Sequence, residues 1–142
     1  MILYINTVSK DEMIIALRVG KNSTAVKKGA ANKNTARPDA IKKIKVNHNQ
    51  AEKLLPALET FLKAHKVKLS DLKKIVVASR GGSFTSLRIG VITANALAYA
   101  LKIPVVAEEK TVRKNKKFGR YSIVEPDYDR EPNIGAPKSV LF

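Results

Sequence analysis

The stretch "SRGGSFTSLRIGVITANALAYAL", residues 79–101, begins as a glycine turn and continues as a helix with almost no polar face. On a helical wheel of about 100° per residue, two apolar faces lie between two thin polar stripes. The first face comprises Ile89, Ile92, Ala96, Tyr99 and Ala100, and the second comprises Leu87, Gly90, Val91, Ala94, Leu97, Ala98 and Leu101. A helix on the outside of a sheet needs only one apolar face. We therefore expect a protein partner to pack against the second face, which is lined with small residues.

Strand patterns precede this helix and predict an α/β domain. Residues 1–8 and 12–19 are apolar with β-forming residues, and together they predict a β-hairpin. Residues 41–46 alternate isoleucine and valine with lysine, which predicts a third strand with one solvated face. Residues 73–79 are typical of a buried parallel strand, and the glycines follow it at once.

Residues 50–65 predict a second helix, which is amphipathic. Its apolar arc comprises Ala51, Leu54, Leu55, Leu58, Phe61, Leu62 and His65. We expect Asn49 to cap this helix, with Glu52 three residues on completing a variant of the capping box. His65 lies near the helix end, where we expect it to pack or to cap the C-terminus rather than to bind a ligand.

The glycine turn lacks the residues that two known chemistries require. A phosphate-binding Walker loop closes with a lysine followed by serine or threonine, and no lysine follows Gly81 and Gly82 in the turn. Ser83 resembles a hydrolase nucleophile only loosely, because Thr85 stands where the second glycine of that motif belongs. We expect Ser83 or Thr85 to cap the helix, and the two glycines to supply backbone angles that other residues disfavour.

Composition limits the organisation of the chain. Its 142 residues, 44% of them hydrophobic, suit one domain, residues 1–142, with a single core. There is no cysteine and there are two histidines, which excludes disulfides and cysteine-based zinc sites, and we expect neither a metal nor a cofactor. Charged residues at positions 10–12 exclude a signal peptide, and residues 89–101 are too few to span a bilayer. We expect a cytoplasmic protein.

The net charge of +15 is concentrated in two segments. Residues 21–45 hold eight lysines and arginines against the single acid Asp39, and residues 110–120 hold six against none. Clusters of this kind indicate a polyanionic partner, because lysines that meet phosphates release counterions. The alternative is that the basic insertion, residues 21–40, and the basic loop, residues 108–120, are solvated surface segments. The candidates for contact with nucleic acid are Lys27, Lys28, Arg113, Lys114, Lys116 and Lys117.

The glycine turn and its helix resemble the TsaB (YeaZ) family of bacterial tRNA threonylcarbamoyladenosine biosynthesis proteins. The family pattern is Gly-Pro-Gly-Ser-Phe-Thr-Gly-Leu-Arg-Ile-Gly, which residues 80–90 match except at Arg80, Gly81 and Ser86. Three further segments are similar to family motifs, namely "ILYINT" (2–7), "QAEKLLP" (50–56) and "PDYDR" (126–130). The resemblance covers residues 1–8, 41–107 and 121–132.

The resemblance implies a fold. The family has two lobes of the actin-like, ribonuclease H-like ATPase (ASKHA) fold, and this chain is similar to the N-terminal lobe, a mixed five-stranded sheet with two main helices. Most of the second lobe is expected to be missing between Val106 and Tyr121. The basic loop then stands in its place, and residues 121–142 form a C-terminal tail.

The resemblance also implies a function. In the family the two long helices form a bundle with the catalytic relative TsaD, so we expect a scaffold that supports threonylcarbamoyl transfer to an adenosine of tRNA. A small ATPase, TsaE, would be a second partner, and a homodimer is expected when the chain is alone. The residues expected to bind the partner are Leu87, Gly90, Val91, Ala94, Leu97, Ala98, Leu101, Leu54, Leu58 and Phe61.

The expected absence of catalysis depends on two features of the sequence, the spacing of its histidines and the residue at the end of its first strand. The catalytic relative holds its metal with a His-x-x-x-His motif, whereas His48 and His65 are too far apart to form one. An actin-like ATPase ends its first strand with a carboxylate that organises magnesium, and Asn6 stands there in this chain. Two alternatives remain, a basic tRNA-binding module or homodimer that acts without a TsaD-type partner, and a residual ATP-dependent enzyme.

Overall fold

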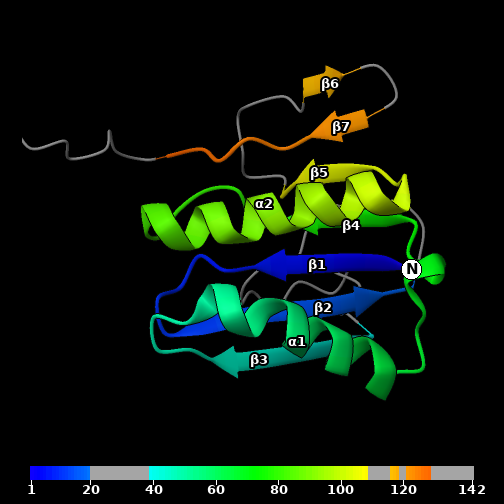
Figure 1. Cartoon of the computed structure of the whole chain (residues 1–142), viewed down its shortest axis with the longest axis horizontal. Coiled ribbons are helices and arrows are strands. Elements are labelled where there is room, and N and C mark those ends of the chain that lie inside the picture. The colour runs from blue at the N-terminus through cyan, green and yellow to red at the C-terminus, as the bar shows by residue number, and fades with distance from the viewer. Residues whose placement is uncertain (20–38, 109–115, 119–120, 129–142) are drawn as a thin grey trace, which may run out of the picture.

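The computed structural model describes residues 1–19, 39–108, 116–118 and 121–128, with only the backbone of 116–118 and of residue 121. Five strands form one mixed sheet in the order β3-β2-β1-β4-β5 (Figure 1). They are β1 (Ile2–Asn6), β2 (Glu12–Arg18), β3 (Ala40–Lys45), β4 (Lys74–Val77) and β5 (Val105–Ala107). The first three are antiparallel neighbours, and β1, β4 and β5 run parallel. The predicted mixed five-stranded sheet is confirmed.

Two helices cover one face of this sheet. Helix α1 (Gln50–Ala64) and helix α2 (Phe84–Leu101) lie side by side in front of the strands, and the short 3-10 helix η1 (Leu69–Asp71) follows α1 (Figure 1). The core between helices and sheet contains Ile5 and Ile75 from the strands, Phe61 from α1 and Val91 from α2, each 2% exposed or less. Both predicted helices are therefore confirmed.

A second, two-stranded sheet differs from the expected organisation. Strand β6 (Lys116–Phe118) pairs antiparallel with β7 (Tyr121–Ile123). The first lies within the segment expected to be a basic loop, and the second begins the segment expected to be a tail. Each of these strands has only three residues. An alternation of apolar and polar side chains cannot be recognised in the sequence over so short a stretch.

Helix α2 lies unusually close to the carboxyl end of β1. The Thr7 hydroxyl donates a hydrogen bond to the Ser86 carbonyl at 2.6 Å, and a methyl group added at Gly90 would overlap Thr7 Oγ1. In the turn before the helix, a methyl group added at Gly82 would overlap the Val8 carbonyl. Small residues on this face thus permit the helix to approach the sheet, because a larger side chain would force the two apart.

The ends of the helices test the predicted caps. Ser83 caps α2, accepting a hydrogen bond from the Ser86 N–H at 3.2 Å, and Gly81 and Gly82 have φ angles of 85° and 80°, as predicted. His65 occupies the C-cap of α1, its ring 4.6 Å from that of Phe61, which confirms its packing and capping role.

The capping box predicted for α1 is wrong. Asn49 occupies the N-cap position, but its side chain makes no hydrogen bond to the helix. Its backbone angles, φ −115° and ψ 33°, are not the extended ones that direct a cap side chain onto the first turn. The Asn49 Oδ1 instead accepts a hydrogen bond from the N–H of Asn47 at 3.1 Å.

Residues 122–128, which we call the C-terminal strap, are held along α2 and β5. The Asn95 side chain forms two hydrogen bonds with the backbone of Val124. It donates to the Val124 carbonyl at 2.8 Å and accepts from the Val124 N–H at 3.0 Å. The Val105 N–H donates to the Ser122 hydroxyl at 2.9 Å, and Val124 is 2% exposed. The Tyr128 ring stacks on Phe84 of α2, with 3.9 Å between centroids. The strap is therefore an integral part of the fold.

The close approach of α2 to Thr7 predicts the effect of adding one methyl group. In an exposed helix interior Gly→Ala stabilises a protein by about 1 kcal/mol, but Gly90→Ala should destabilise this one by about 1–3 kcal/mol because of the overlap. Denaturant unfolding measures the change in free energy. In the Thr7→Ala background the cost of Gly90→Ala should fall, and an equal cost in both backgrounds would contradict the assigned contact.

The two hydrogen bonds of Asn95 predict a local effect on the strap. Asn95→Ala should destabilise the fold by about 1–3 kcal/mol, because two backbone groups of the buried Val124 lose their partners. Hydrogen exchange at the Val124 amide should accelerate more than exchange at the Ile5 amide in β1. Equal acceleration at both amides would mean that the strap does not open separately from the sheet.

Candidate functional site

The exposed face of α2 is apolar. Ile92 is 59% exposed and Tyr99 is 64% exposed, and Arg88, Ala96 and Ala100 are exposed on the same side of the helix. Because the opposite side is buried on the sheet, these residues form the outward stripe of an otherwise apolar helix. A stripe of this kind on a folded domain usually marks a surface that another protein covers.

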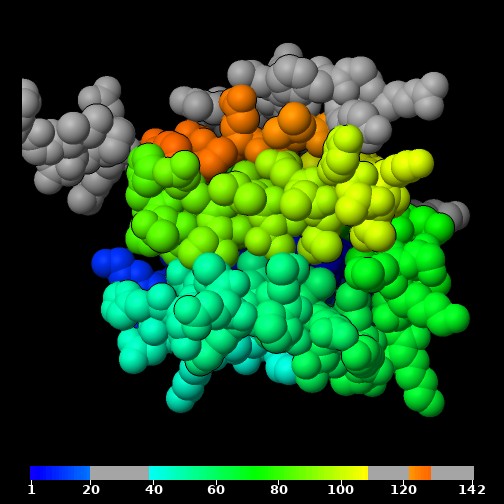
Figure 2. Space-filling view, in the orientation of Figure 1, coloured from blue at the N-terminus to red at the C-terminus, as the bar shows by residue number. Residues whose placement is uncertain are grey.

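Helix α1 extends this stripe into a broader surface. Leu55 is 52% exposed on α1, and Leu69 of η1 is 46% exposed. Figure 2 shows α1 and α2 adjoining along the viewed face of the molecule. A groove of about 600 Å³ opens between α1, the segment after it and α2, and it is lined by Leu55, Pro56, Leu58, Glu59, Leu62, Lys63, Val67, Lys68, Leu69 and Leu97. We call these groove residues, together with Ile92 and Tyr99, the helical surface.

Most residues predicted to bind a partner lie instead in the core of this chain. The buried residues of the prediction, each 3% exposed or less, are Leu87, Val91, Ala94, Ala98, Leu54, Leu58 and Phe61. Gly90 is buried against Thr7, and Leu97 and Leu101 are partly buried. Two of the predicted residues, Leu58 and Leu97, also line the groove of the helical surface. The sheet covers the small-residue face because only small side chains allow the helix to lie so close to it. The prediction that the partner packs against the second apolar face of α2 was therefore wrong. The face that points outward carries Ile92 and Tyr99.

The residues that sequence reasoning missed are Leu55, Leu69, Ile92 and Tyr99. Ile92 and Tyr99 belong to the first apolar face of the helical wheel, which was assigned to the core. The available signal was size, because glycine and alanine mark the side of a helix that packs closely on a neighbour, whereas bulky side chains are tolerated facing outward. Leu69 lies in the three-residue 3-10 helix η1, which is too short for periodicity to indicate which side chains are exposed.

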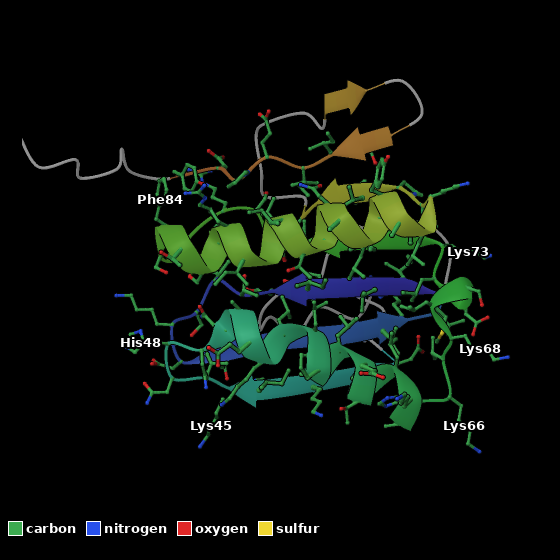
Figure 3. The ribbon with its side chains drawn as sticks, in the orientation of Figure 1. Lys45, His48, Lys66, Lys68, Lys73 and Phe84 are labelled. Atoms are coloured by element: carbon green, nitrogen blue, oxygen red, sulfur yellow. The ribbon has the colours of Figure 1, made fainter. Side chains whose placement is uncertain are left out.

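An aromatic cluster ends the outward stripe at the start of α2. Phe84 is 36% exposed, the Tyr128 ring covers one side of it, and the Arg88 guanidinium lies 5.6 Å from its ring centroid. Figure 3 labels Phe84 at this end of the helix. Phe84 belongs to the start of α2 and stacks on Tyr128 of the strap, so the strap and the outward stripe of α2 meet at Phe84.

Two charged residues of the helical surface, Glu59 and Lys63, form an ion pair. The Lys63 ammonium lies 2.6 Å from the Glu59 carboxylate one turn earlier in α1, and both side chains are well exposed. The hydrogen bond and charge of Lys63 lower the pKa of the Glu59 carboxyl below its ordinary value. The groove therefore has an ion pair of zero net charge on its α1 side, and the positively charged Lys68 lies at its η1 end.

The end of β1 carries the position where an actin-like ATPase holds its metal. Asn6 Nδ2 donates a hydrogen bond to the Tyr4 hydroxyl at 3.0 Å, and Asn6 Oδ1 accepts one from the Val8 N–H at 2.9 Å. The Tyr4 hydroxyl in turn donates to the Glu108 carboxylate at 3.2 Å. Burial and the charge of Glu108 raise the pKa of Tyr4 above its ordinary value, so the hydroxyl keeps its proton. Both amide atoms of Asn6 are thus engaged within the chain.

The remaining candidates concern metals and nucleic acid. Within the described residues, no group of three histidine, cysteine, aspartate or glutamate side chains could hold a metal ion. Four of the candidates for contact with nucleic acid lie outside the described residues, namely Lys27, Lys28, Arg113 and Lys114. Lys116 and Lys117 lie in β6, where the structure describes only the backbone.

Helix α2 also has the length and composition of a helix that could cross a membrane. It begins at Phe84, five residues earlier than the segment considered in the sequence, and spans 18 residues. Core helices share these properties, and Leu87, Val91 and Ala94 of α2 are buried against the sheet. In this structure 33% of the helix is buried, so packing within the fold accounts for part of its apolar character.

Comparisons with known proteins agree with this architecture. The family model of TsaD, tRNA N6-adenosine threonylcarbamoyltransferase, matches residues 41–111, which are half of the chain. TsaB, a tRNA threonylcarbamoyladenosine biosynthesis protein of Bacillus subtilis, is 36% identical over 85 residues, which are 57% of this chain and 36% of that protein. The tRNA N6-adenosine threonylcarbamoyltransferase of Rhodopirellula baltica is 41% identical over 56 residues, 39% of this chain and 16% of that protein.

The solved structure of YeaZ from Pseudomonas aeruginosa is similar in fold. Its TM-score is 0.57 at 25% sequence identity, over 75% of this chain and 42% of that one. The matched part of the chain thus spans about a third of the B. subtilis protein and about two fifths of YeaZ. The sheet with its two helices has the actin-like, ribonuclease H-like architecture, and the resemblance to TsaB and YeaZ read from the sequence motifs is confirmed.

Proposed function

This chain belongs to the family that the TsaD model describes and is similar to TsaB, and we propose that it is a non-catalytic scaffold in tRNA threonylcarbamoyladenosine synthesis. It binds a TsaD-type catalytic subunit through the helical surface. The observation that carries this proposal is the apolar, exposed stripe of α2 beside the groove against α1. A fold that buries one face of α2 and leaves Ile92 and Tyr99 outward needs a second protein to cover them.

The proposal that the chain is not itself a catalyst is supported by the end of β1. An amide carries no charge to hold a hard cation, and the two amide atoms of Asn6 are engaged by Tyr4 and Val8. Ser83 likewise acts as a helix cap, with its hydroxyl accepting the Ser86 N–H.

The proposal extends to further partners and to the location of the chain. A TsaE-type ATPase is a second partner in the same assembly, and the assembly works in the cytoplasm, where tRNA is modified. When the TsaD-type subunit is absent, two copies of this chain cover each other's helical surface as a homodimer. The basic insertion and the basic loop approach tRNA phosphates, since counterion release favours such contacts.

Partner binding tests the helical surface directly. Ile92→Asp should weaken binding of the TsaD-type subunit from the same organism by at least about tenfold, because a carboxylate is then desolvated in an apolar interface. The matched control is Ile41→Asp, since Ile41 is 52% exposed on β3, away from both helices. Calorimetry measures the affinity of the three proteins for the partner. Both variants replace exposed side chains, so their unfolding free energies should stay within about 0.5 kcal/mol of the original.

Two results would contradict the scaffold proposal. The first is an unaltered chain that does not bind the TsaD-type subunit, and the second is an Ile92→Asp variant that binds it as tightly as the control does. Sedimentation of the chain alone tests the homodimer, which should dissociate in Ile92→Asp and persist in Ile41→Asp. A monomer for all three proteins would contradict the homodimer but would leave the scaffold role standing.

A further inference from the structure

A third group of basic residues lies within the described part of the chain, at the end of the molecule where both helices finish. Lys66 follows α1, Lys68 precedes η1, Lys73 precedes β4 and Lys102 caps the C-terminus of α2. We call these four lysines the basic end. Lys66, Lys68 and Lys73 lie within eight residues of the sequence, and folding brings Lys102, at the C-terminus of α2, to the same end. Figure 3 labels three of them, Lys66, Lys68 and Lys73, at the same end of the structure.

Backbone contacts bring these segments together. The Lys73 N–H donates to the Met1 carbonyl at 2.8 Å, and the Ile75 N–H donates to the Pro104 carbonyl at 2.9 Å. Lys73 therefore lies at the start of β1, and Lys102, two residues before Pro104, lies at the start of β4. The Asp71 carboxylate of this end accepts the Lys68 backbone N–H at 2.8 Å.

The four side chains point into solvent. Each lysine is exposed, and among the described residues none of their ammonium groups forms an ion pair. The ion pairs found there are Lys63 with Glu59 and Arg80 with Asp127. Four positive charges gather at an end where Asp71 supplies one negative charge, and the excess positive charge costs stability unless an anion binds it.

Helix capping alone does not account for these lysines. The negative ends of α1 and α2 attract cations, but Lys68 and Lys73 lie outside both helices. Lys66 and Lys102 have φ angles of 54° and 56°, the left-handed region in which helices commonly end on glycine. A side chain in that region costs about 1 kcal/mol, so glycine would serve the cap better than lysine does.

The basic end adjoins the helical surface. Lys68 lines the groove beside Leu69, and Lys63 lines it on α1. A subunit seated on the helical surface would therefore have the basic end at its border. With the net charge of +15, this arrangement favours a polyanion whose charges repeat along a backbone over a compact acidic ligand.

From these observations we infer that the basic end binds the phosphate backbone of an RNA beside the partner subunit. The inference deepens the proposed scaffold function, on which the choice of tRNA as the RNA depends. Lysine contacts of this type neutralise phosphates without reading bases, so they position the RNA and leave its sequence to the partner.

Salt dependence of RNA binding tests the inference on the full chain. The variant neutralises half of the basic end (Lys73→Gln and Lys102→Gln), and the control removes the same charge elsewhere (Lys10→Gln and Lys53→Gln), again from exposed, described lysines. The probe is an unmodified tRNA transcript, titrated from low to high salt by fluorescence anisotropy. Each lost phosphate contact lowers the log–log slope by roughly 0.7–0.9, so the variant's slope should fall by about 1.5. The control slope should change by less than about 0.5.

The outcomes separate this inference from the scaffold proposal. Equal slope changes in variant and control, no change in either, or no measurable binding of tRNA by the original chain would overturn the basic end as an RNA site. Loss of the TsaD-type partner with an unchanged RNA slope would assign the basic end to an acidic surface of that protein, which also overturns it. If the original chain fails to bind the partner but the slopes differ as expected, the scaffold proposal fails and the RNA site stands.

Discussion

The contact between α2 and the carboxyl end of β1 determines most of what the surface of this protein can do. Thr7 is tied to the Ser86 carbonyl, and Gly90 leaves no room for a side chain between helix and strand. This contact fixes the rotation of α2 about its own axis. Leu87, Val91 and Ala94 are then inside, and Ile92 and Tyr99 are outside. The proposed partner surface is thus a consequence of how the core packs, rather than a separate feature added to it.

The order of the first four strands and the two long helices could be predicted from periodicity, and the family from the resemblance of the glycine turn and its helix to TsaB. The orientation of α2 could not, because its sequence has two apolar faces and the wheel alone does not say which one the sheet covers. Size would have decided it, since close approach requires glycine at position 90. The prediction of a capping box at Asn49 was wrong for another reason. Its residue type was suitable, but capping depends on extended backbone angles that neighbouring residues impose.

Contacts between distant segments were also beyond the sequence. Asn95 falls in a thin polar stripe of α2. Nothing in the sequence around it indicates that its side chain forms hydrogen bonds with Val124, 29 residues further on. The basic end was not predicted for a related reason, since Lys102 is far from Lys66, Lys68 and Lys73 in the sequence and joins them only through the pairing of β1, β4 and β5. Charge runs are readable in a sequence, whereas charge gathered by folding is not.

The C-terminal strap has a consequence for the edges of the sheet. An open edge strand offers unpaired backbone groups to other molecules and is a starting point for aggregation. At one edge, the Val105 N–H of β5 is already engaged by the Ser122 hydroxyl. At the other, Lys43 and Lys45 of β3 are exposed, and charge of one sign discourages a second copy from adding as a strand. A sheet protected in this way at both edges can expose an apolar helical surface and still associate through helices rather than through strands.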